Sequence, residues 1–117
     1  MNLGFIGTGK IASSVITGIC KSQIKFKQIT ISSRSKKISS SLKKRFKKIV
    51  VLKDNQEIVN KSNWVFLSVT PKVGEKIIKN LKFKTSQTII SFISTINLTE
   101  LKKMIKVKSK IVRAIPL

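Results

Sequence analysis

The sequence predicts an α/β fold in which helices cover both faces of an open parallel sheet. Two observations carry this prediction. Short apolar runs of strand length alternate with segments of helical periodicity along the whole chain, and the connections between them are short. Gly7 and Gly9 then lead from the first apolar run straight into the first helical segment. Together these features indicate a Rossmann-type, doubly wound sheet, and 117 residues are enough for one such domain.

Strands are expected wherever a short, mostly apolar run is bounded by polar residues or glycine. The run Trp64–Val69 is nearly all apolar, which is typical of a strand buried on both faces. In chain order, the expected strands are Leu3–Ile6, Ile29–Ser32, Ile49–Leu52, Trp64–Val69, Thr88–Phe92 and Lys110–Ala114. The expected helices between them are Lys10–Lys21, Ser35–Lys47, Asn55–Lys61, Val73–Leu81 and Leu98–Ile105.

Side-chain spacing and capping residues support these helices. Asp54 or Asn55 is expected to cap the third helix. Asn97 and Glu100 have the spacing of a capping box at the start of the last helix. Apolar residues recur at helical spacing in the first two helices, at Ile11, Val15, Ile16 and Ile19 and then at Ile38, Leu42 and Phe46.

The glycine turn has the pattern of a dinucleotide-binding loop. Gly7 permits a tight turn, Gly9 lets the backbone approach a pyrophosphate, and the small Ala12 lets the helix pack close to the strand. The N-terminus of the helix adds a partial positive charge. The alternative is an ordinary glycine turn in an α/β domain. Because ligands of such sheets bind outside the carboxyl ends of the strands, four segments are expected to meet there: Gly7–Ile11, Ser32–Arg34, Val69–Lys72 and Ile93–Thr95.

The end of the second strand favours NADP(H) over NAD(H). NAD-binding domains usually place Asp or Glu there, to accept a hydrogen bond from the ribose 2′-OH. This sequence instead has Ser32, Ser33 and Arg34 followed by further serine and lysine residues, with no acid. Arg34 can bind a 2′-phosphate through two parallel hydrogen bonds. The alternative is that Ser33 or Ser35 only caps the following helix.

The chain is strongly basic. Its 25 Lys and Arg residues outnumber 4 Asp and Glu residues, which gives a formal net charge of +21. Such a charge is typical of nucleic-acid binders. However, the lysines are spread over every segment, and the abundance of Lys over Arg resembles the bias of an AT-rich genome. We therefore expect a solvated surface and no specific nucleic-acid partner.

Other features argue against several classes of protein. The chain has no histidine and only scattered carboxylates, so a metal site or a hydrolytic triad is not expected. No apolar run is long enough for a transmembrane helix, and glycines interrupt the apolar N-terminus, unlike in a signal peptide. The lone Cys20 is expected to be a semi-buried thiol in a reducing, cytoplasmic compartment.

Six separated motifs follow one another along the chain: Gly4–Ala12, Ser32–Ser35, Asp54–Val59, Val65–Lys72, Ile89–Ser91 and Ile111–Pro116. In this order they resemble the N-terminal half of pyrroline-5-carboxylate reductase, and the last is similar to that family's Arg-x-Met-Pro-Asn strand. The first and fourth motifs also occur in related NADP-linked reductases, whereas the ordered set is fairly specific. The resemblance implies an oxidoreductase acting on a CH–NH group, which makes proline by reducing 1-pyrroline-5-carboxylate with NADPH.

The resemblance also implies a role for each matching position. The roles run from the pyrophosphate to the 2′-phosphate and adenosine, and then to the nicotinamide ribose and the nicotinamide. Contacts to the pyrophosphate would come from Gly7, Thr8, Gly9, Lys10 and Ile11. The 2′-phosphate would lie near Ser33 and Arg34, and the adenosine side would contact Asn55. The nicotinamide ribose would lie along Ser68, Val69, Thr70 and Pro71, and the nicotinamide near Ile93, Ser94 and Thr95. The protein would mainly position the cofactor for hydride transfer to a cyclic imino acid. No residue of the chain is assigned a catalytic role.

The family continues into an all-helical domain that forms the homo-oligomer and supplies most of the imino-acid site. We therefore expect residues 1–117 to be the NADP-binding domain without that second domain, inactive alone. Thr70, Thr95 and Leu117 stand where the family usually has Lys, Gly and Asn. These departures keep open another NADP-dependent reductase, acting on a β-hydroxy acid or an F420-type cofactor. An inactive nucleotide- or polyanion-binding module is the alternative outside the enzymes.

Overall fold

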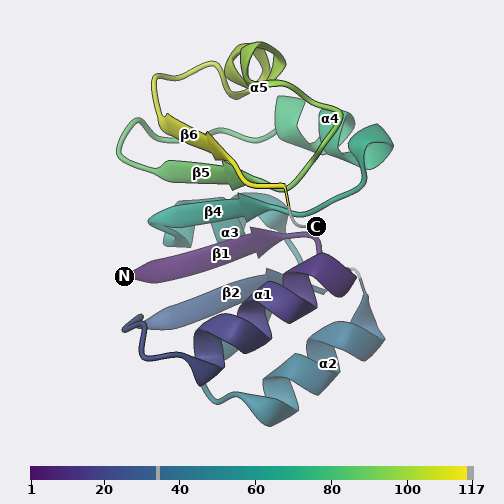
Figure 1. The fold of residues 1–117 in the computed structure, drawn as a ribbon, viewed down its shortest axis with the longest axis vertical. Helices are drawn as coiled ribbons and strands as arrows, with labels where there is room; N and C mark the ends of the chain where they lie inside the picture. Colours follow the sequence, from purple (N-terminus) through teal and green to yellow (C-terminus); the bar gives the residue numbers. More distant parts are fainter. Residues whose placement is uncertain (34, 116–117) are drawn as a thin grey trace.

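Six parallel strands form one sheet at the centre of the molecule, in the order β3-β2-β1-β4-β5-β6 (Figure 1). The computed structural model describes residues 1–33 and 35–115. The strands are β1 (Asn2–Ile6), β2 (Gln28–Ser32), β3 (Ile49–Leu52), β4 (Trp64–Leu67), β5 (Thr88–Ser91) and β6 (Lys110–Arg113). The chain starts in the middle of the sheet and moves outward first on one side and then on the other. This order confirms the predicted Rossmann-type, doubly wound fold.

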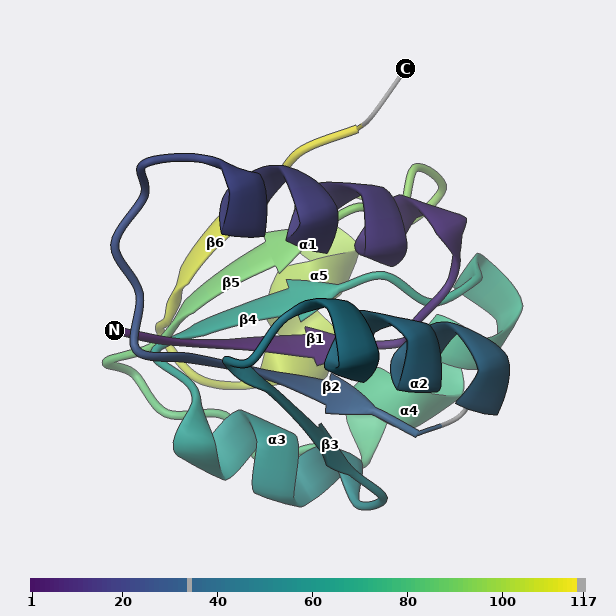
Figure 2. The ribbon, with the colours of Figure 1, turned by 90° about the horizontal axis from the view of Figure 1, so that it is seen from below.

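Helices cover the sheet on both faces (Figure 2). They are α1 (Lys10–Lys21), α2 (Lys36–Arg45), α3 (Asn55–Lys61), α4 (Pro71–Lys79) and α5 (Leu98–Ile105). Helices α1 and α2 pack on one face, and α3, α4 and α5 pack on the other. No helix in the described ranges combines the length and the apolar character needed to cross a membrane.

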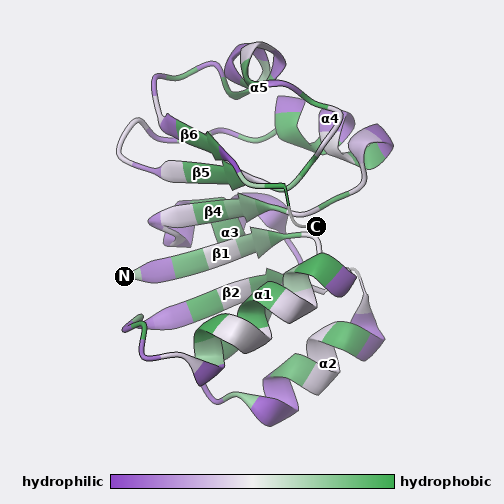
Figure 3. Cartoon of the chain, viewed as in Figure 1, coloured by the Kyte–Doolittle hydropathy of each residue, from purple (hydrophilic) through white to green (hydrophobic). Residues whose placement is uncertain are grey.

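Each face of the sheet has its own apolar core. Because side chains alternate along a strand, Phe5 of β1 joins the core under α1 and α2, whereas Ile6 joins the core under α3, α4 and α5. Phe5 stacks on Phe66 of β4 with ring centroids 4.4 Å apart. Figure 3 shows the resulting pattern, with hydrophobic residues along the strands and hydrophilic residues on the outer turns of the helices. The strands lie between two apolar layers, which explains why they appear in the sequence as nearly continuous apolar runs.

Two element boundaries near the carboxyl edge of the sheet differ from the prediction. Strand β4 ends at Leu67 rather than Val69, because the Ser68 hydroxyl donates to the carbonyls of Ile6 (3.1 Å) and Gly7 (2.9 Å) and the chain turns away there. Helix α4 begins at Pro71 rather than Val73, since proline is favoured in the first helical turn. The remaining elements agree with the prediction to within one or two residues at each end.

The predicted helix caps of α3 and α5 are confirmed. The Asp54 carboxylate accepts from the Gln56 N–H at 3.0 Å, and Asn97 and Glu100 form a capping box. Such a cap stabilises a helix by about 1 kcal/mol. Ser35 occupies the N-cap position of α2, but its side chain makes no capping hydrogen bond. The start of α3 is thus fixed by its own side chains, whereas the Ser35 hydroxyl is not used by its helix.

Candidate functional site

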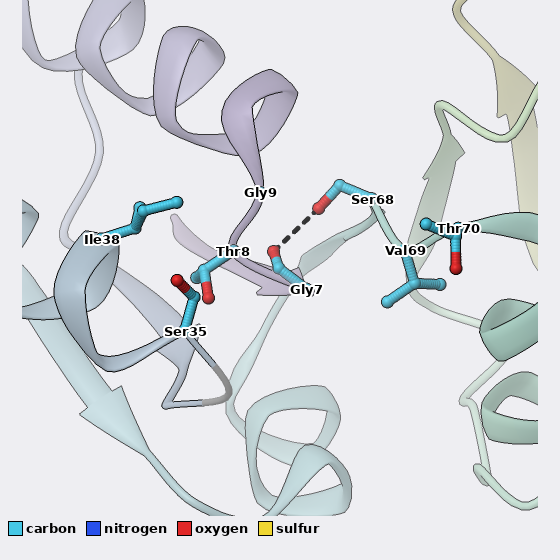
Figure 4. A pocket seen from close by; sticks show the side chains of 8 residues that line it. All are labelled: Gly7, Thr8, Gly9, Ser35, Ile38, Ser68, Val69 and Thr70. Atoms are coloured by element: carbon cyan, nitrogen blue, oxygen red, sulfur yellow. Dashed lines mark hydrogen bonds between the residues drawn. The ribbon is translucent and has the colours of Figure 1, made fainter.

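The loops that follow β1, β2, β4 and β5 meet at the carboxyl edge of the sheet, where three adjoining cavities lie. The first, called the glycine cavity, has a volume of about 420 Å³ (Figure 4). It is lined by Gly7, Thr8, Gly9, Ser35, Ile38, Ser68, Val69 and Thr70. Figure 4 shows the glycine turn between Ser35 and Ile38 on one side and Val69 and Thr70 on the other. The predicted phosphate turn therefore lines an open groove, with Gly9 exposed and Gly7 and Thr8 buried.

Gly7 has a conformation that a residue with a side chain rarely adopts. Its φ angle is +95°, and a Cβ built on it would lie 2.7 Å from the backbone carbonyl oxygen of Ser68. The Ser68 hydroxyl donates to the Gly7 carbonyl at 2.9 Å, which is drawn in Figure 4. Gly7 is thus required for the tight turn, as expected from the sequence.

Gly9 differs from Gly7, because its backbone conformation is open to any residue and no other atom lies near the position of a Cβ. It is the N-cap of α1 in an extended conformation (φ −88°, ψ −167°), and a Cβ built on it would meet no atom within 4 Å. The N–H groups of Lys10 and Ile11 lie in the first turn of α1, where no helical carbonyl can accept them. Gly9 therefore leaves clear the space through which an anion can approach the positive end of the helix.

Thr8 and Ala12 hold this turn against the sheet. Thr8 is 3% exposed, and its hydroxyl donates to the Ser32 carbonyl at the end of β2 (3.2 Å). Ala12 is fully buried in the core under α1, as the predicted close approach of helix and strand requires. By contrast, Ile11 was expected on the apolar stripe of the helix and is 46% exposed at the cavity edge.

The second cavity, called the Ser33 cavity, has a volume of about 240 Å³ and lies beside the end of β2. The Ser33 N–H donates to the Leu52 carbonyl at 3.1 Å, which fixes the end of β2 against the end of β3. The lining residues are Gly7, Ser32, Ser33, Lys53, Asn55, Val69 and Ile77. Arg34, predicted to act beside Ser33, lies outside the described residues, as does Leu117.

The third cavity, called the Pro71 cavity, has a volume of about 360 Å³ and extends from the glycine turn to the end of β5. The Arg113 guanidinium of β6 donates to the Ser94 carbonyl at 2.8 Å, which ties the last strand to this loop. The cavity is lined by Gly9, Lys10, Ile11, Ser68, Val69, Thr70, Pro71, Phe92, Ile93 and Ser94. Thr95 is exposed and lines none of the three cavities, so the structure does not bring it together with the other predicted residues.

Sequence reasoning missed several lining residues. Ser35 and Ile38 come from the start of α2, Lys53 directly follows β3, and Ile77 lies in α4. A signal for Ser35 was present, since it stands at the expected start of a helix next to the predicted site. For Ile38 the signal was misleading, because an apolar residue at helical spacing is usually assigned to the core.

The side chains that line the three cavities are mostly hydroxyl-bearing and apolar, with two lysines. No Asp, Glu or Cys lines any of the three cavities within residues 1–33 and 35–115. Cys20 is half-buried on α1, as expected, and burial raises the pKa of its thiol. The polar groups that line the three cavities include hydroxyls, backbone N–H groups and lysines, which suit a phosphorylated ligand.

A family model described as NADP oxidoreductase, coenzyme F420-dependent, matches residues 2–97. The chain belongs to this family. The matched residues run from the start of β1 to Asn97, just before α5, and they include every lining residue of the three cavities. The family assignment also agrees with the strand order, which is that of dinucleotide-binding domains.

Several pyrroline-5-carboxylate reductases are similar to this chain over nearly its whole length. Pyrroline-5-carboxylate reductase 3 of Danio rerio is 27% identical over 99% of this chain and 41% of that protein. The structure of 1-pyrroline-5-carboxylate reductase from Streptococcus pyogenes has a TM-score of 0.82 and 29% identity, covering 99% of this chain and 42% of that one. The corresponding Plasmodium falciparum enzyme, solved with NADP bound, has a TM-score of 0.83 and 24% identity, covering 99% of this chain and 42% of that one, and it supports the fold. The chain thus spans about two fifths of these relatives, and it is similar to their N-terminal NADP-binding domain.

Proposed function

We propose that this chain is the NADPH-binding domain of a reductase similar to pyrroline-5-carboxylate reductase. The observation that carries the proposal is the glycine turn. Gly7 takes the positive φ angle of a tight turn, and Gly9 faces open space at the N-terminus of α1. A side chain at position 9 would fill the space that a pyrophosphate needs, so the present residues fit a dinucleotide.

The cavities support one orientation of the cofactor. Gly7, Thr8, Gly9, Lys10 and Ile11 would hold the pyrophosphate, and Ser33, Arg34 and Asn55 would hold the adenosine end. Ser68, Val69, Thr70 and Pro71 would lie along the nicotinamide ribose, with Ile93 and Ser94 near the nicotinamide. Thr95 belongs to the same loop and would lie at its outer end. No acid lines the adenosine end in the described part of the chain, which favours a 2′-phosphate over a free 2′-OH.

The proposed reaction is the reduction of 1-pyrroline-5-carboxylate to proline, the last step of proline biosynthesis. NADPH supplies a hydride to the carbon of the ring C=N bond, the nitrogen carries a proton from solvent or a protein group, and NADP⁺ leaves. The residues of this chain would hold the cofactor in position for that transfer. The groups that bind the imino acid would come from an all-helical C-terminal domain, which in this proposal also forms a homo-oligomer. A cytoplasmic location is part of the same proposal.

A second candidate function is another NADP-dependent reductase of the same family, acting on an F420-type cofactor or a β-hydroxy acid. The description of the matching family favours the first of these. Thr70 lines both the glycine cavity and the Pro71 cavity, so its departure from the lysine of pyrroline-5-carboxylate reductases lies at the proposed nicotinamide end.

Calorimetric titration with NADPH and with NADH, at low and at high salt, tests the cofactor assignment. We expect NADPH to bind more tightly than NADH and to keep most of its affinity at high salt, because backbone N–H groups hold the pyrophosphate. Binding that collapses steeply with salt would instead indicate a polyanion-binding surface, which the net charge of +21 permits. Absence of binding by both dinucleotides would contradict the proposal.

The substitution Arg34→Ala tests the preference between the two dinucleotides. Losing a bidentate phosphate contact is expected to weaken NADPH binding by about tenfold and to leave NADH nearly unchanged. The same calorimetric titration measures both affinities. An equal loss for the two dinucleotides would show that Arg34 does not contact the 2′-phosphate.

A further inference from the structure

Lys53 directly follows β3 and lies beside the end of β2. The parallel register pairs Ser32 with Leu52, so Ser33 and Lys53 are the next residues of the two strands at the carboxyl edge. The hydrogen bond from the Ser33 N–H to the Leu52 carbonyl (3.1 Å) continues the strand pairing to this point. Both residues line the Ser33 cavity. The fold therefore places an additional cation next to the serine that ends β2.

Ser32, which also lines the Ser33 cavity, has a buried side-chain oxygen that the described residues do not satisfy. Ser32 is 4% exposed, and its buried Oγ has no hydrogen-bond partner among the described residues. Its backbone carbonyl is already used, since it accepts from the Thr8 hydroxyl. A buried hydroxyl without a partner is unfavourable, and its place beside Ser33, Lys53 and Asn55 fits a polar ligand in this cavity.

Lys53 is the one charged residue that lines this cavity among the described residues. The one ion pair found in the described ranges joins Lys79 to Glu75 on α4, so no carboxylate neutralises Lys53 within that part of the chain. The nearest acid in the sequence is Asp54, and its carboxylate accepts from the Gln56 N–H at the start of α3. A lysine is a flexible point charge with three donors, and hydroxyls are good phosphate ligands. The cavity therefore suits a phosphate monoester better than a neutral ribose.

We propose that Lys53 is a specificity-determining residue that binds the 2′-phosphate of NADPH from the β3 side. This inference rests on the proposed function, because it requires the adenosine end of the cofactor to lie in the Ser33 cavity. Lys53 would act together with Ser33 and with the unsatisfied Ser32 hydroxyl. The preference for NADPH would then depend on two strands, β2 and β3, and not only on the residues after β2.

The test compares Lys53→Gln with the control Lys61→Gln, which removes the same charge from the last turn of α3. Each protein is titrated calorimetrically with NADPH, NADH, adenosine 2′,5′-bisphosphate and adenosine 5′-phosphate. Lys53→Gln is expected to weaken NADPH and the bisphosphate by about tenfold, and NADH and the monophosphate by less than about twofold. Lys61→Gln is expected to leave all four affinities within about twofold of wild type. Lys53→Arg should keep the preference, because it retains the positive charge.

Several results would overturn the inference. Lys53→Gln could weaken all four ligands equally, or match Lys61→Gln, and either result would show an effect of net charge alone. If Lys53→Gln left the ratio of NADPH to NADH affinity unchanged, the inference would also be overturned. The proposed function would still stand in that case, provided that the wild-type protein binds NADPH. If the wild type bound neither dinucleotide, the proposed function itself would fail. Thermal melting of each variant shows that it is folded, which the exposure of Lys53 and Lys61 leads us to expect.

Discussion

Replacing Gly9 by valine is expected to abolish cofactor binding and to leave the fold intact. The two effects separate because Gly9 has an extended backbone conformation open to any residue and no neighbour within 4 Å of the position of a Cβ. The added side chain would occupy space shared by the glycine cavity and the Pro71 cavity. We expect affinity for NADPH to fall by more than roughly a hundredfold, or about 2.8 kcal/mol. The free energy of unfolding should fall by no more than about 1 kcal/mol, the cost of replacing glycine by valine at a helix N-cap.

Gly18→Val is the matched control for this experiment. Gly18 lies on the same helix, and a Cβ there would also meet no atom within 4 Å. It is separated from the cavities by two turns of α1, so the same substitution should leave NADPH affinity unchanged. Calorimetric titration gives the affinities, and urea denaturation gives the stabilities. Normal binding by Gly9→Val would show that the pyrophosphate does not approach the turn at this residue.

Replacing Gly7 by alanine is expected to destabilise the fold itself. At φ +95° a side chain is strained, and its Cβ would lie 2.7 Å from the Ser68 carbonyl oxygen, which is backbone and cannot rotate away. The strain and the close contact together should lower the free energy of unfolding by about 2–4 kcal/mol. Cofactor binding should weaken as well, since relief of the contact would move β1 and the loop after β4 apart.

Urea denaturation measures this loss, and Gly18→Ala provides a control of opposite sign. Gly18 lies in the interior of α1, where alanine is favoured over glycine by about 0.5–1 kcal/mol, so this variant should be more stable than wild type. If Gly7→Ala were as stable as the wild type, the positive φ angle of the turn would not be needed for folding.

The doubly wound fold class and the identity of most elements could be predicted from the sequence, because burial on both faces makes each strand apolar. The boundaries around Ser68 could not. Val69 is as apolar as the strand before it, so periodicity extends β4 by two residues. What ends the strand is the pair of hydrogen bonds from the Ser68 hydroxyl to the carbonyls of Ile6 and Gly7, more than sixty residues away in sequence. Such a contact has no local signal.

The site shows the same division between local and distant signals. The glycine turn is a local pattern, and the meeting of the loops at one edge follows from parallel strands, so most lining residues could be predicted. Lys53 could not, because its proximity to Ser33 depends on the pairing of Ser32 with Leu52, which the sequence does not reveal. Helical spacing predicts Ile11 on the apolar stripe of α1, but Ile11 is 46% exposed and lines the Pro71 cavity.

The position of Trp64 allows its fluorescence to report both unfolding and ligand binding. It is the first residue of β4, 40% exposed, and packs against Phe66 at the edge of the sheet opposite to the cavities. Strand geometry separates the Cα atoms of Trp64 and Ser68 by about 13 Å, so the indole lies at the opposite end of β4 from the proposed cofactor site. Its intrinsic emission therefore reports unfolding, and a ligand at the opposite edge would change it by energy transfer rather than by direct contact. Because the chain has one tryptophan, the unfolding signal and the binding signal both come from Trp64. One fluorescence sample can therefore distinguish a folded variant that binds no cofactor from an unfolded variant.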